Sequence, residues 1–354
     1  KIRAELRRGG WDDVEWVRGV DLHRRPPDSI FGDIKPSDPK QGACMDCWLI
    51  AALSSMALCP DSVRHLFKGA GGCVREDGQY TVRLWDFRSG KWQDIIVDDL
   101  VPCRPRSWWQ RSADPLFAKA SGASAFWATL AEKAFAKFSG SYEVLSKGGM
   151  GHYAFQAMTG EPDMFALIKF SGNSTWDFLM SKLVYQRAQW IMKEDRQQTH
   201  WLGLRTDDES NEKLEQLFCG LDAHRLFNTL AAMMQDGYFI VVYNTTKEGV
   251  ERWLDNGLVD NHLFSVLRMV FLEEEEEIVR LLCLRNPWGD RRKWTGAWSD
   301  GSPEWQRHPE AKKLGYEPAA DGVFWMCAED FAEHFNFATM CKKSWAVRGS
   351  PDID

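Results

Sequence analysis

Apolar residues run almost without a break over residues 47–58, directly after a polar turn that contains glycine at residues 41–46. Asp46 is a residue type favoured at helix N-caps, and Pro60 cannot continue a helix. The pattern therefore predicts one helix over residues 47–58. Because its residues are apolar or small on almost every face, we expect this helix to be buried on most sides.

Helical spacing of apolar residues predicts further helices at residues 61–67, 125–138, 176–190 and 226–234. In the second of these, Glu132 and Lys133 interrupt the apolar positions, so we expect both on the side that faces water. A polar segment at residues 193–215 follows without a clear period.

Strand composition at residues 79–85 and 91–97, on either side of a polar turn, predicts a hairpin. Later strands are predicted at residues 238–243, 262–272 and 278–285, and they lie close enough in sequence to pair antiparallel. The five glutamates at residues 273–277 are typical of a solvated hairpin tip. Residues 1–40 are polar and rich in proline, which predicts an extended arm.

The first part of the chain is thus predicted to be mostly helical and the second part to be rich in strands. A chain of 354 residues exceeds one ordinary core, so we expect two domains. We predict an α+β protein with a helical domain at residues 1–160 and an antiparallel-sheet domain at residues 161–354.

Composition narrows the class of protein. With 44% hydrophobic and 27% charged residues and no apolar run near the ~18 residues that span a bilayer, no membrane span is expected. A net charge of −7 without a basic, aromatic-rich cluster argues against nucleic acid as a partner. The first residue is Lys1, without an initiator methionine or a signal-peptide pattern, so we expect a piece of a longer chain with flanking domains.

Nine scattered cysteines favour a reducing compartment over a disulfide framework, and we expect an intracellular, cytoplasmic protein. Cys44 and Cys47 form a C-x-x-C pair, but a second pair that would complete a zinc site is missing from the sequence, so no metal ligand is predicted.

Cys47 lies in the first turn of its predicted helix, where free N–H groups and the helix dipole favour a thiolate. A thiolate is a nucleophile. Two other interpretations remain open at this point: a small buried hydrophobe, as most free cysteines are, or a redox pair with Cys44.

His262 begins one predicted strand and Asn286 follows the next. A lone histidine at a strand start is usually structural, and Asn-Pro is by default a turn. Two neighbouring strands would nevertheless allow Asn286 to accept a hydrogen bond from one imidazole nitrogen, which leaves the other to face Cys47. That arrangement is a cysteine–histidine–asparagine triad.

Several motifs together resemble the calpain protease core, in the family's order and approximate spacing over most of the chain. They are Gln41-Gly42, Asp46-Cys47-Trp48-Leu49, Asp98-Asp99-Leu100-Val101-Pro102, Gly140-Ser141-Tyr142-Glu143, the strand with His262, Arg285-Asn286-Pro287-Trp288-Gly289, Trp294-Thr295-Gly296-Ala297-Trp298-Ser299-Asp300 and Asp321-Gly322-Val323-Phe324-Trp325-Met326.

The resemblance implies a papain-like, two-lobed cysteine protease with the cleft between a helical lobe and an antiparallel-sheet lobe. By it, Cys47 is the nucleophile, His262 the general base and then acid, and Asn286 the residue that orients the imidazole. Gln41 is implied as an oxyanion-hole donor and Trp288 as a cleft residue that shields the triad. The implied reaction is hydrolysis of internal peptide bonds of proteins through an acyl-thioester.

The family core binds one calcium ion in each half, and this chain departs from that pattern. Ala125 and Lys293 stand where the family has acids, and Val323 replaces another acid, whereas Asp38, Asp300 and Asp321 are retained. Calcium needs about six to eight oxygen ligands, so we expect no required cofactor and calcium-independent activation.

Three further departures concern other regions. Asn261 precedes His262 where the family commonly has glycine, residues 162–224 look like an insertion, and the sequence contains no EF-hand pattern.

Two functions compete with an endopeptidase. The first is a catalytically silent calpain-like module that binds proteins. The second is a dithiol oxidoreductase that uses Cys44 and Cys47, which would leave His262 and Asn286 unexplained.

Overall fold

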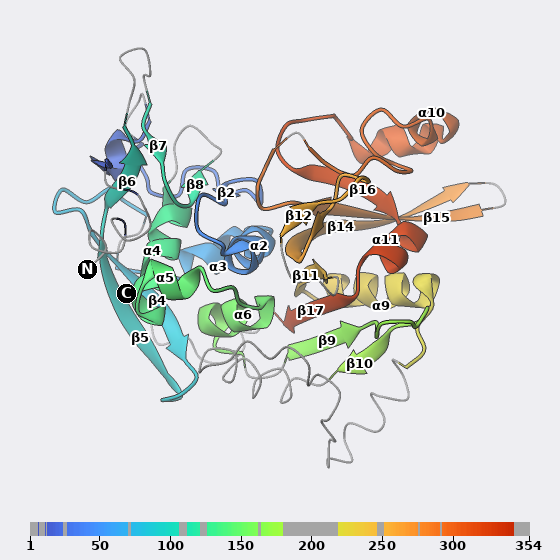
Figure 1. Cartoon of the computed structure of the whole chain (residues 1–354), viewed down its shortest axis with the longest axis horizontal. Helices are drawn as coiled ribbons and strands as arrows, with labels where there is room; N and C mark the ends of the chain where they lie inside the picture. Colours follow the sequence, from blue (N-terminus) through green and yellow to red (C-terminus); the bar gives the residue numbers. More distant parts are fainter. Residues whose placement is uncertain are drawn as a thin grey trace.

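Figure 1 shows the chain as a computed structural model, with the helices and short sheets of its first part beside a large antiparallel sheet from its second part. The structure describes residues 6, 11, 13–23, 27–69, 72–105, 112–120, 126–161, 164–179, 219–245, 251–274, 277–290 and 292–342. Mixed helix and antiparallel sheet confirms the α+β class. The domain boundary at residues 160/161 stays a prediction.

The first part contains more strand than the sequence pattern predicts. Its sheets have the orders β1-β6-β7 and β3-β4-β5, and β2 pairs with β8. Its elements are β1 (Glu15–Arg18), η1 (Gly19–Asp21), β2 (Pro39–Lys40), α2 (Cys47–Met56), α3 (Pro60–Arg64), β3 (Phe67–Lys68), β4 (Gln79–Asp86), β5 (Lys91–Asp98), β6 (Leu100–Arg104), β7 (Asp114–Pro115), β8 (Lys119–Ala120), α4 (Trp127–Ser139), α5 (Tyr142–Leu145) and α6 (Gly151–Thr159). The predicted hairpin is β4–β5, whereas the other strands have two to five residues and are too short to show a period.

Helix α2 is buried at all ten of its positions, as its apolar pattern predicts. It ends two residues earlier than expected, and Leu58 beyond its end is 39% exposed. Asp46 occupies the N-cap position but makes no side-chain cap hydrogen bond. The polar residue before the helix therefore has another role, which the site geometry explains.

The expectation that Glu132 and Lys133 face water is wrong, because both are buried in α4. Glu132 Oε1 accepts the Ala118 backbone N–H at 2.9 Å. Lys133 Nζ donates to Asp98 Oδ1 at 2.6 Å and to the carbonyl oxygens of Asp98 at 3.0 Å and Leu100 at 2.7 Å. Hydrogen bonding of this kind offsets the cost of burying charge, which a hydrophobicity pattern does not register.

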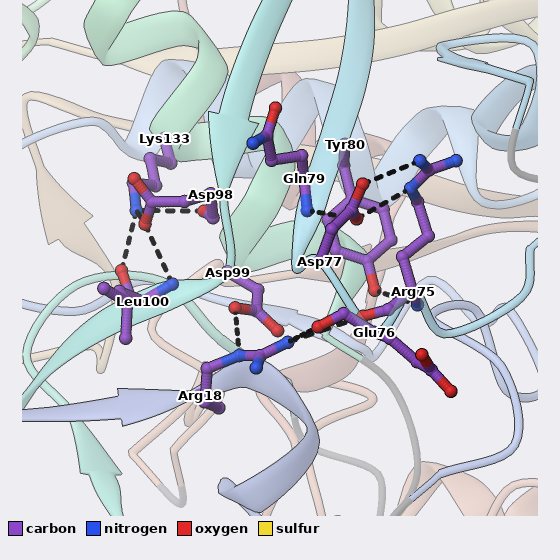
Figure 2. A network of polar contacts seen from close by, with 10 residues as sticks. All are labelled: Arg18, Arg75, Glu76, Asp77, Gln79, Tyr80, Asp98, Asp99, Leu100 and Lys133. Atoms are coloured by element: carbon purple, nitrogen blue, oxygen red, sulfur yellow. Dashed lines mark hydrogen bonds and ion pairs between the residues drawn. The ribbon is translucent and has the colours of Figure 1, made fainter.

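Figure 2 shows how this contact continues into a polar network that ties β1 to the β4–β5 hairpin. Arg18 Nε donates to Asp99 Oδ1 at 2.6 Å, and Arg75 pairs with Asp77 at 2.9 Å. The adjacent acids Asp98 and Asp99 thus anchor two different elements, α4 and β1, to one strand end.

The second part forms a seven-stranded sheet of order β10-β9-β17-β11-β14-β15-β16, in which each neighbouring pair is antiparallel. This confirms the antiparallel pairing expected for the later strands. Its elements are β9 (Met164–Ile168), β10 (Asp177–Leu179), α9 (Ala223–Gln235), β11 (Tyr238–Asn244), β12 (Arg252–Trp253), β13 (Val259–Asp260), β14 (His262–Glu274), β15 (Glu277–Arg285), α10 (Glu304–Arg307), η2 (Pro309–Leu314), β16 (Val323–Cys327), α11 (Ala328–His334) and β17 (Phe337–Lys342).

The segment interpreted as an insertion contributes to this sheet. Within residues 162–224, β9 and β10 pair with each other, and β9 also pairs with β17. The helix predicted over residues 176–190 is wrong at residues 177–179, which form β10, and its remainder from residue 180 lies outside the described residues.

The apolar core joins the helices of the first part directly to the sheet. One cluster contains α2, α4 and α6 together with five residues of the seven-stranded sheet, Met164, Phe239, Val241, Leu263 and Cys341. A second cluster lies between the sheet and α9 and α11. In the described part of the chain, no helix combines the length and the apolar character that crossing a bilayer requires.

Buried hydroxyl groups add polar contacts between α2 and the sheet. Ser265 Oγ on β14 donates to the Ala51 carbonyl oxygen at 2.8 Å, and Arg285 at the end of β15 donates to Ser54 Oγ at 2.7 Å. Ser55 Oγ donates to the Ile240 carbonyl oxygen at 3.3 Å and accepts the Ile240 N–H at 3.2 Å. The position of α2 relative to β11, β14 and β15 is therefore fixed by directional contacts as well as by packing.

Candidate active site

Cys47 is the first residue of α2 and is 7% exposed. Its thiol thus lies at the helix end that carries the unpaired N–H groups. The neighbouring elements are β11 and β14, against which α2 packs.

His262 and Asn286 meet because β14 and β15 pair antiparallel, with Ser265 opposite Arg285. The start of β14 therefore lies beside the residue that follows β15. His262 Nε2 is 2.9 Å from Asn286 Oδ1, and the backbone N–H of Trp288 donates to the same oxygen at 2.9 Å. Two converging donors identify this atom as the amide oxygen, so Nε2 carries a proton.

Cys47 lies close to His262, and so does Glu251, which the sequence pattern does not identify as a site residue. Sγ of Cys47, a carboxylate oxygen of Glu251 and a ring nitrogen of His262 all lie within 4.8 Å of one another. Glu251 Oε1 is 2.8 Å from His262 Nδ1, and the Glu251 side chain is only 15% exposed. The nitrogen expected to face Cys47 therefore also faces a carboxylate.

The electrostatic setting of Cys47 differs from the expectation based on the helix dipole. Burial raises the pKa of the Cys47 thiol well above its ordinary value, and the negative charge of Glu251 adds to the shift. A hydrogen bond from the Leu263 backbone acts in the opposite direction and is outweighed. In this arrangement the thiol, and not the thiolate, is the favoured form.

Aromatic rings enclose the imidazole. The Trp288 ring centroid lies 4.8 Å from that of His262, and Phe264 lies 5.2 Å from it on an edge-to-face contact. Trp253 packs on Trp288 at 5.0 Å. The His262 side chain is fully buried as a result.

Gln41 connects the turn before α2 to the segment that carries Asn286. Its backbone N–H donates to the Pro287 carbonyl oxygen at 2.9 Å, and its side-chain Nε2 donates to the Cys44 carbonyl oxygen at 2.8 Å. The side-chain amide has two N–H groups, so one remains for another acceptor.

Cys44 is buried and does not pair with Cys47. Its Sγ lies 3.1 Å from Ser146 Oγ, and none of the nine cysteines, all of which lie in the described part of the chain, forms a disulfide. The arrangement in this structure is not that of an oxidised redox pair.

A second group of titratable side chains lies under the N-terminus of α2. Cys44, Asp46 and Glu132 bring one potential metal-ligand atom each to within 4.8 Å of one another, and all three are buried. Burial raises the pKa of Asp46 to about 7 and that of Glu132 well above its ordinary value, and the Asp46 charge raises that of Glu132 further. The Asp46 side chain thus lies close to Glu132 of α4 and does not cap α2.

The residues around His262 and Asn286 have unusual backbone requirements. Asn261 has φ of 54°, in the left-handed region that glycine and asparagine tolerate best. Its Oδ1 accepts hydrogen bonds from the Tyr243 hydroxyl and, at 3.5 Å, from Thr245 Oγ1. Asparagine can therefore occupy position 261, where the family commonly has glycine.

Gly322 lies beside Asn286 and has φ of 80°. A Cβ at this position would lie 2.5 Å from the Asn286 carbonyl oxygen.

The positions implied as calcium ligands in the second half are arranged around an ammonium group. Lys293 Nζ donates to the carbonyl oxygens of Ala319 at 2.9 Å and Val323 at 2.8 Å and forms an ion pair with Asp300. The Lys293 side chain is 5% exposed. The oxygens around Lys293 Nζ already bind a buried positive charge, so this group does not fit a calcium ion.

In the first half, Asp38 is buried and accepts the Lys35 backbone N–H at 2.8 Å. Burial raises the pKa of Asp38, which disfavours its charged, ligating form. Ala125 lies outside the described residues.

Comparison with known proteins gives one consistent result. The sequence model of a family described as "Calpain family cysteine protease" matches residues 5–342. The chain is similar to Calpain-5 of Caenorhabditis elegans, with 28% identity over 366 residues, 93% of this chain and 47% of that protein. It is also similar to the Calpain-1 catalytic subunit of Bos taurus (28% identity, 93% of this chain, 38% of that protein) and to Calpain clp-4 of Caenorhabditis elegans (31%, 93% and 38%). The chain thus spans less than half the length of these curated relatives.

Proposed function

Because the chain belongs to the calpain family of cysteine proteases, we propose that it is an intracellular endopeptidase that hydrolyses internal peptide bonds of proteins. The observation that carries the proposal is the contact of 2.9 Å between His262 Nε2 and Asn286 Oδ1, together with Cys47 Sγ within 4.8 Å of a ring nitrogen of His262. A nucleophile, a base and an amide that orients the base are the parts that acyl transfer by a thiol requires.

Each residue has one task in the proposed reaction. His262 Nδ1 takes the proton of the Cys47 thiol, and the resulting thiolate attacks the carbonyl carbon of the scissile bond. Asn286 accepts from Nε2 and so fixes the ring orientation and the tautomer. The imidazolium then gives its proton to the leaving amine, which produces a thioester on Cys47, and water attacks that thioester with His262 as base.

The negative charge that develops on the carbonyl oxygen needs donors that are already in place. The backbone N–H of Cys47 and the second N–H of the Gln41 amide are the proposed donors. The contact of Gln41 with the Cys44 carbonyl at 2.8 Å supports this role, because it holds the amide close to the start of α2. Trp288, packed against His262, is proposed to keep bulk water from the imidazole.

A papain-like, two-lobed arrangement is part of the proposal. Cys47 comes from the helical first part, whereas His262 and Asn286 come from the sheet, so a substrate strand would lie where the two parts meet. Since the curated relatives are more than twice as long as the matched region, flanking segments are proposed to regulate access to it.

We further propose that this activity needs no calcium, and no step is derived through that ion. The support is the Lys293 ammonium, which already supplies a positive charge to the oxygens of Asp300, Ala319 and Val323. Peptidase activity measured in a chelator and in millimolar calcium is expected to differ by less than about twofold. A steep requirement for calcium would contradict this proposal.

Hydrolysis of an unfolded protein substrate by the wild type and by Cys47→Ser tests the function. We expect cleavage by the wild type, a loss of at least about 10³-fold in kcat for Cys47→Ser, and wild-type activity for Cys44→Ser. Loss of activity in Cys44→Ser would favour the dithiol chemistry. No cleavage of any protein by the wild type would favour the silent binding module.

A thiol reagent separates these outcomes further. If the triad acts as proposed, His262→Ala slows labelling of Cys47 without unfolding the chain, because the thiol loses its base. Equal labelling in both proteins would argue for a silent module.

A further inference from the structure

Glu251 occupies the side of the imidazole that the proposed reaction needs. Nε2 of His262 must donate to Asn286 Oδ1, because that oxygen carries no hydrogen. Nδ1 and Glu251 Oε1, 2.8 Å apart, therefore share one further proton, since neither a bare nitrogen lone pair nor a carboxylate can donate by itself. An imidazole that shares this proton with a carboxylate has no lone pair available for the thiol of Cys47.

The fold brings Glu251 to this point through a short hairpin. Strands β12 and β13 pair with Arg252 opposite Asp260 and Trp253 opposite Val259, so the residue before β12 lies across from the residues that lead into His262. Trp253 packs on Trp288 at 5.0 Å, and the Arg292 guanidinium lies 4.4 Å from the centre of the Trp253 ring. The backbone of the hairpin is thus held, whereas rotation about the Glu251 side-chain bonds suffices to withdraw the carboxylate.

We propose that Glu251 is a positioning residue that closes the resting site: its carboxylate holds His262 Nδ1 and keeps Cys47 in the thiol form until an incoming substrate displaces it. This inference rests on the proposed function. The Glu251 carboxylate and the Cys47 thiol compete for His262 Nδ1, and in this structure the carboxylate is hydrogen-bonded to it. When Glu251 leaves, it carries the shared proton away as a carboxylic acid and releases it to solvent, which frees the lone pair of Nδ1. The Cys47 proton then moves to Nδ1, and the thiolate–imidazolium pair forms at the end of α2.

The charge of Glu251 acts on Cys47 directly as well, as the raised pKa of the thiol indicates. Other ionisable groups face the same site from the elements packed around it. They are Asp46 before α2, Tyr243 on β11, Asp260 on β13 and Asp290 after β15. Glu251 is distinguished from all of these by its contact with the imidazole nitrogen itself.

Alkylation of Cys47 by iodoacetamide, followed by mass spectrometry of the Cys47 peptide over a range of pH, tests the proposal. Glu251→Gln keeps the size of the side chain and Glu251→Ala removes the contact. In both we expect the alkylation rate at pH 7 to rise by about threefold or more and the rate profile to move to lower pH. The exposed thiol of Cys73 in the same samples serves as an internal reference and is expected to react at an unchanged rate.

Asp255→Asn is the matched control, because it removes the same charge from an exposed position of the same hairpin. It is expected to leave Cys47 alkylation unchanged. An increase of less than about threefold in both Glu251 variants, or a decrease, would overturn the proposal. A decrease would mean that the carboxylate activates the imidazole.

Peptide hydrolysis supplies a second readout that a purely structural role would not produce. A site that is open for only part of the time binds substrate more weakly by that fraction. Glu251→Gln is therefore expected to lower KM by about threefold or more with little change in kcat. A fall in kcat without a fall in KM would contradict displacement by the substrate.

The two readouts also separate this inference from the proposed function. Faster alkylation of Cys47 in a chain that cleaves no protein would refute the peptidase and support the role of Glu251. Cleavage by the wild type together with unchanged alkylation in both Glu251 variants would refute only the role of Glu251.

Discussion

Asn261 sets the direction from which His262 enters the site. Its φ of 54° turns the chain sharply between β13 and β14. The hydrogen bonds that its Oδ1 accepts from Tyr243 and Thr245 hold that turn against β11. The backbone turn at Asn261 therefore helps to determine where the imidazole of His262 lies.

Replacement of Asn261 by glycine and by alanine separates backbone strain from side-chain contacts. Alanine loses the hydrogen bonds and resists the left-handed conformation, so we expect it to lower the free energy of unfolding by about 1–2 kcal/mol. Glycine loses the same hydrogen bonds without the strain and is expected to cost less than about 1 kcal/mol. Urea unfolding monitored by tryptophan fluorescence measures both, and equal losses would argue against strain at this position.

The sequence predicts the candidate site better than it predicts the surroundings of that site. The ends of patterned elements at Cys47, His262 and Asn286 leave several interpretations open, and the resemblance to the calpain core singles these residues out. The structure places Cys47 and Asn286 close to His262. Glu251 gives no such signal, because a glutamate among other polar residues looks like a solvated loop position. Only the pairing of β12 with β13 brings its carboxylate to the imidazole.

At the scale of elements, the N-terminal end of α2 packs against α4, where Asp46 and Glu132 are buried close together. Burial keeps the carboxyl groups of Asp46 and Glu132 protonated at pH values where the unfolded chain has released its protons, and the charge of Asp46 raises the pKa of Glu132 further. The folded state therefore binds more protons than the unfolded state, so stability falls as pH rises from about 4 towards and beyond about 7. A hydrophobicity pattern cannot predict this pair, because it assigns Glu132 to the surface.

Glu132→Gln is expected to reduce that pH dependence. The glutamine oxygen can still accept the Ala118 N–H, so stability at pH 5 should change little. The free energy of unfolding is expected to fall between pH 5 and pH 8 in both proteins. Because one titrating group is gone, the fall in the variant should be smaller than that in the wild type by at least about 1 kcal/mol. Thermal unfolding across pH measures the difference. Glu143→Gln, at an exposed position of α5, is the control and should follow the wild type.

Ser55 links α2 to β11 through two hydrogen bonds to one residue of the strand. Ser55→Ala leaves the buried N–H and carbonyl of Ile240 without that partner, so we expect a loss of about 1–3 kcal/mol in the free energy of unfolding. Denaturant unfolding provides the value. A loss below about 0.5 kcal/mol would mean that packing alone holds the helix on the sheet.

At the scale of the whole molecule, we propose that the buried ammonium of Lys293 takes the place that the family resemblance assigns to a calcium ion. Lys293 draws together the segments that contain Asp300, Ala319 and Val323. This contact explains why Lys293 and Val323 can stand where the family has acids. The sequence does not indicate the contact, because Ala319 and Val323 bind Lys293 through their backbone carbonyl oxygens.

Lys293 can be replaced in two informative ways. Lys293→Met leaves two carbonyl oxygens and the partly exposed Asp300 carboxylate without their partner, so we expect a loss of about 2 kcal/mol in stability. Lys293→Glu places two carboxylates together, and millimolar calcium is expected to raise its Tm by several degrees while leaving that of the wild type unchanged. An equal rise in the wild type would contradict the exclusion of calcium at this position.

The apolar cluster that contains both α2 and the five sheet residues Met164, Phe239, Val241, Leu263 and Cys341 has a practical consequence. Fragments divided at residues 160/161 would each display to solvent a face that is now shared, and such faces promote aggregation. Neither fragment is a suitable recombinant target by itself, whereas co-expression of the two should allow them to assemble by complementation. The core that holds the chain together is therefore the same core that places Cys47 close to His262.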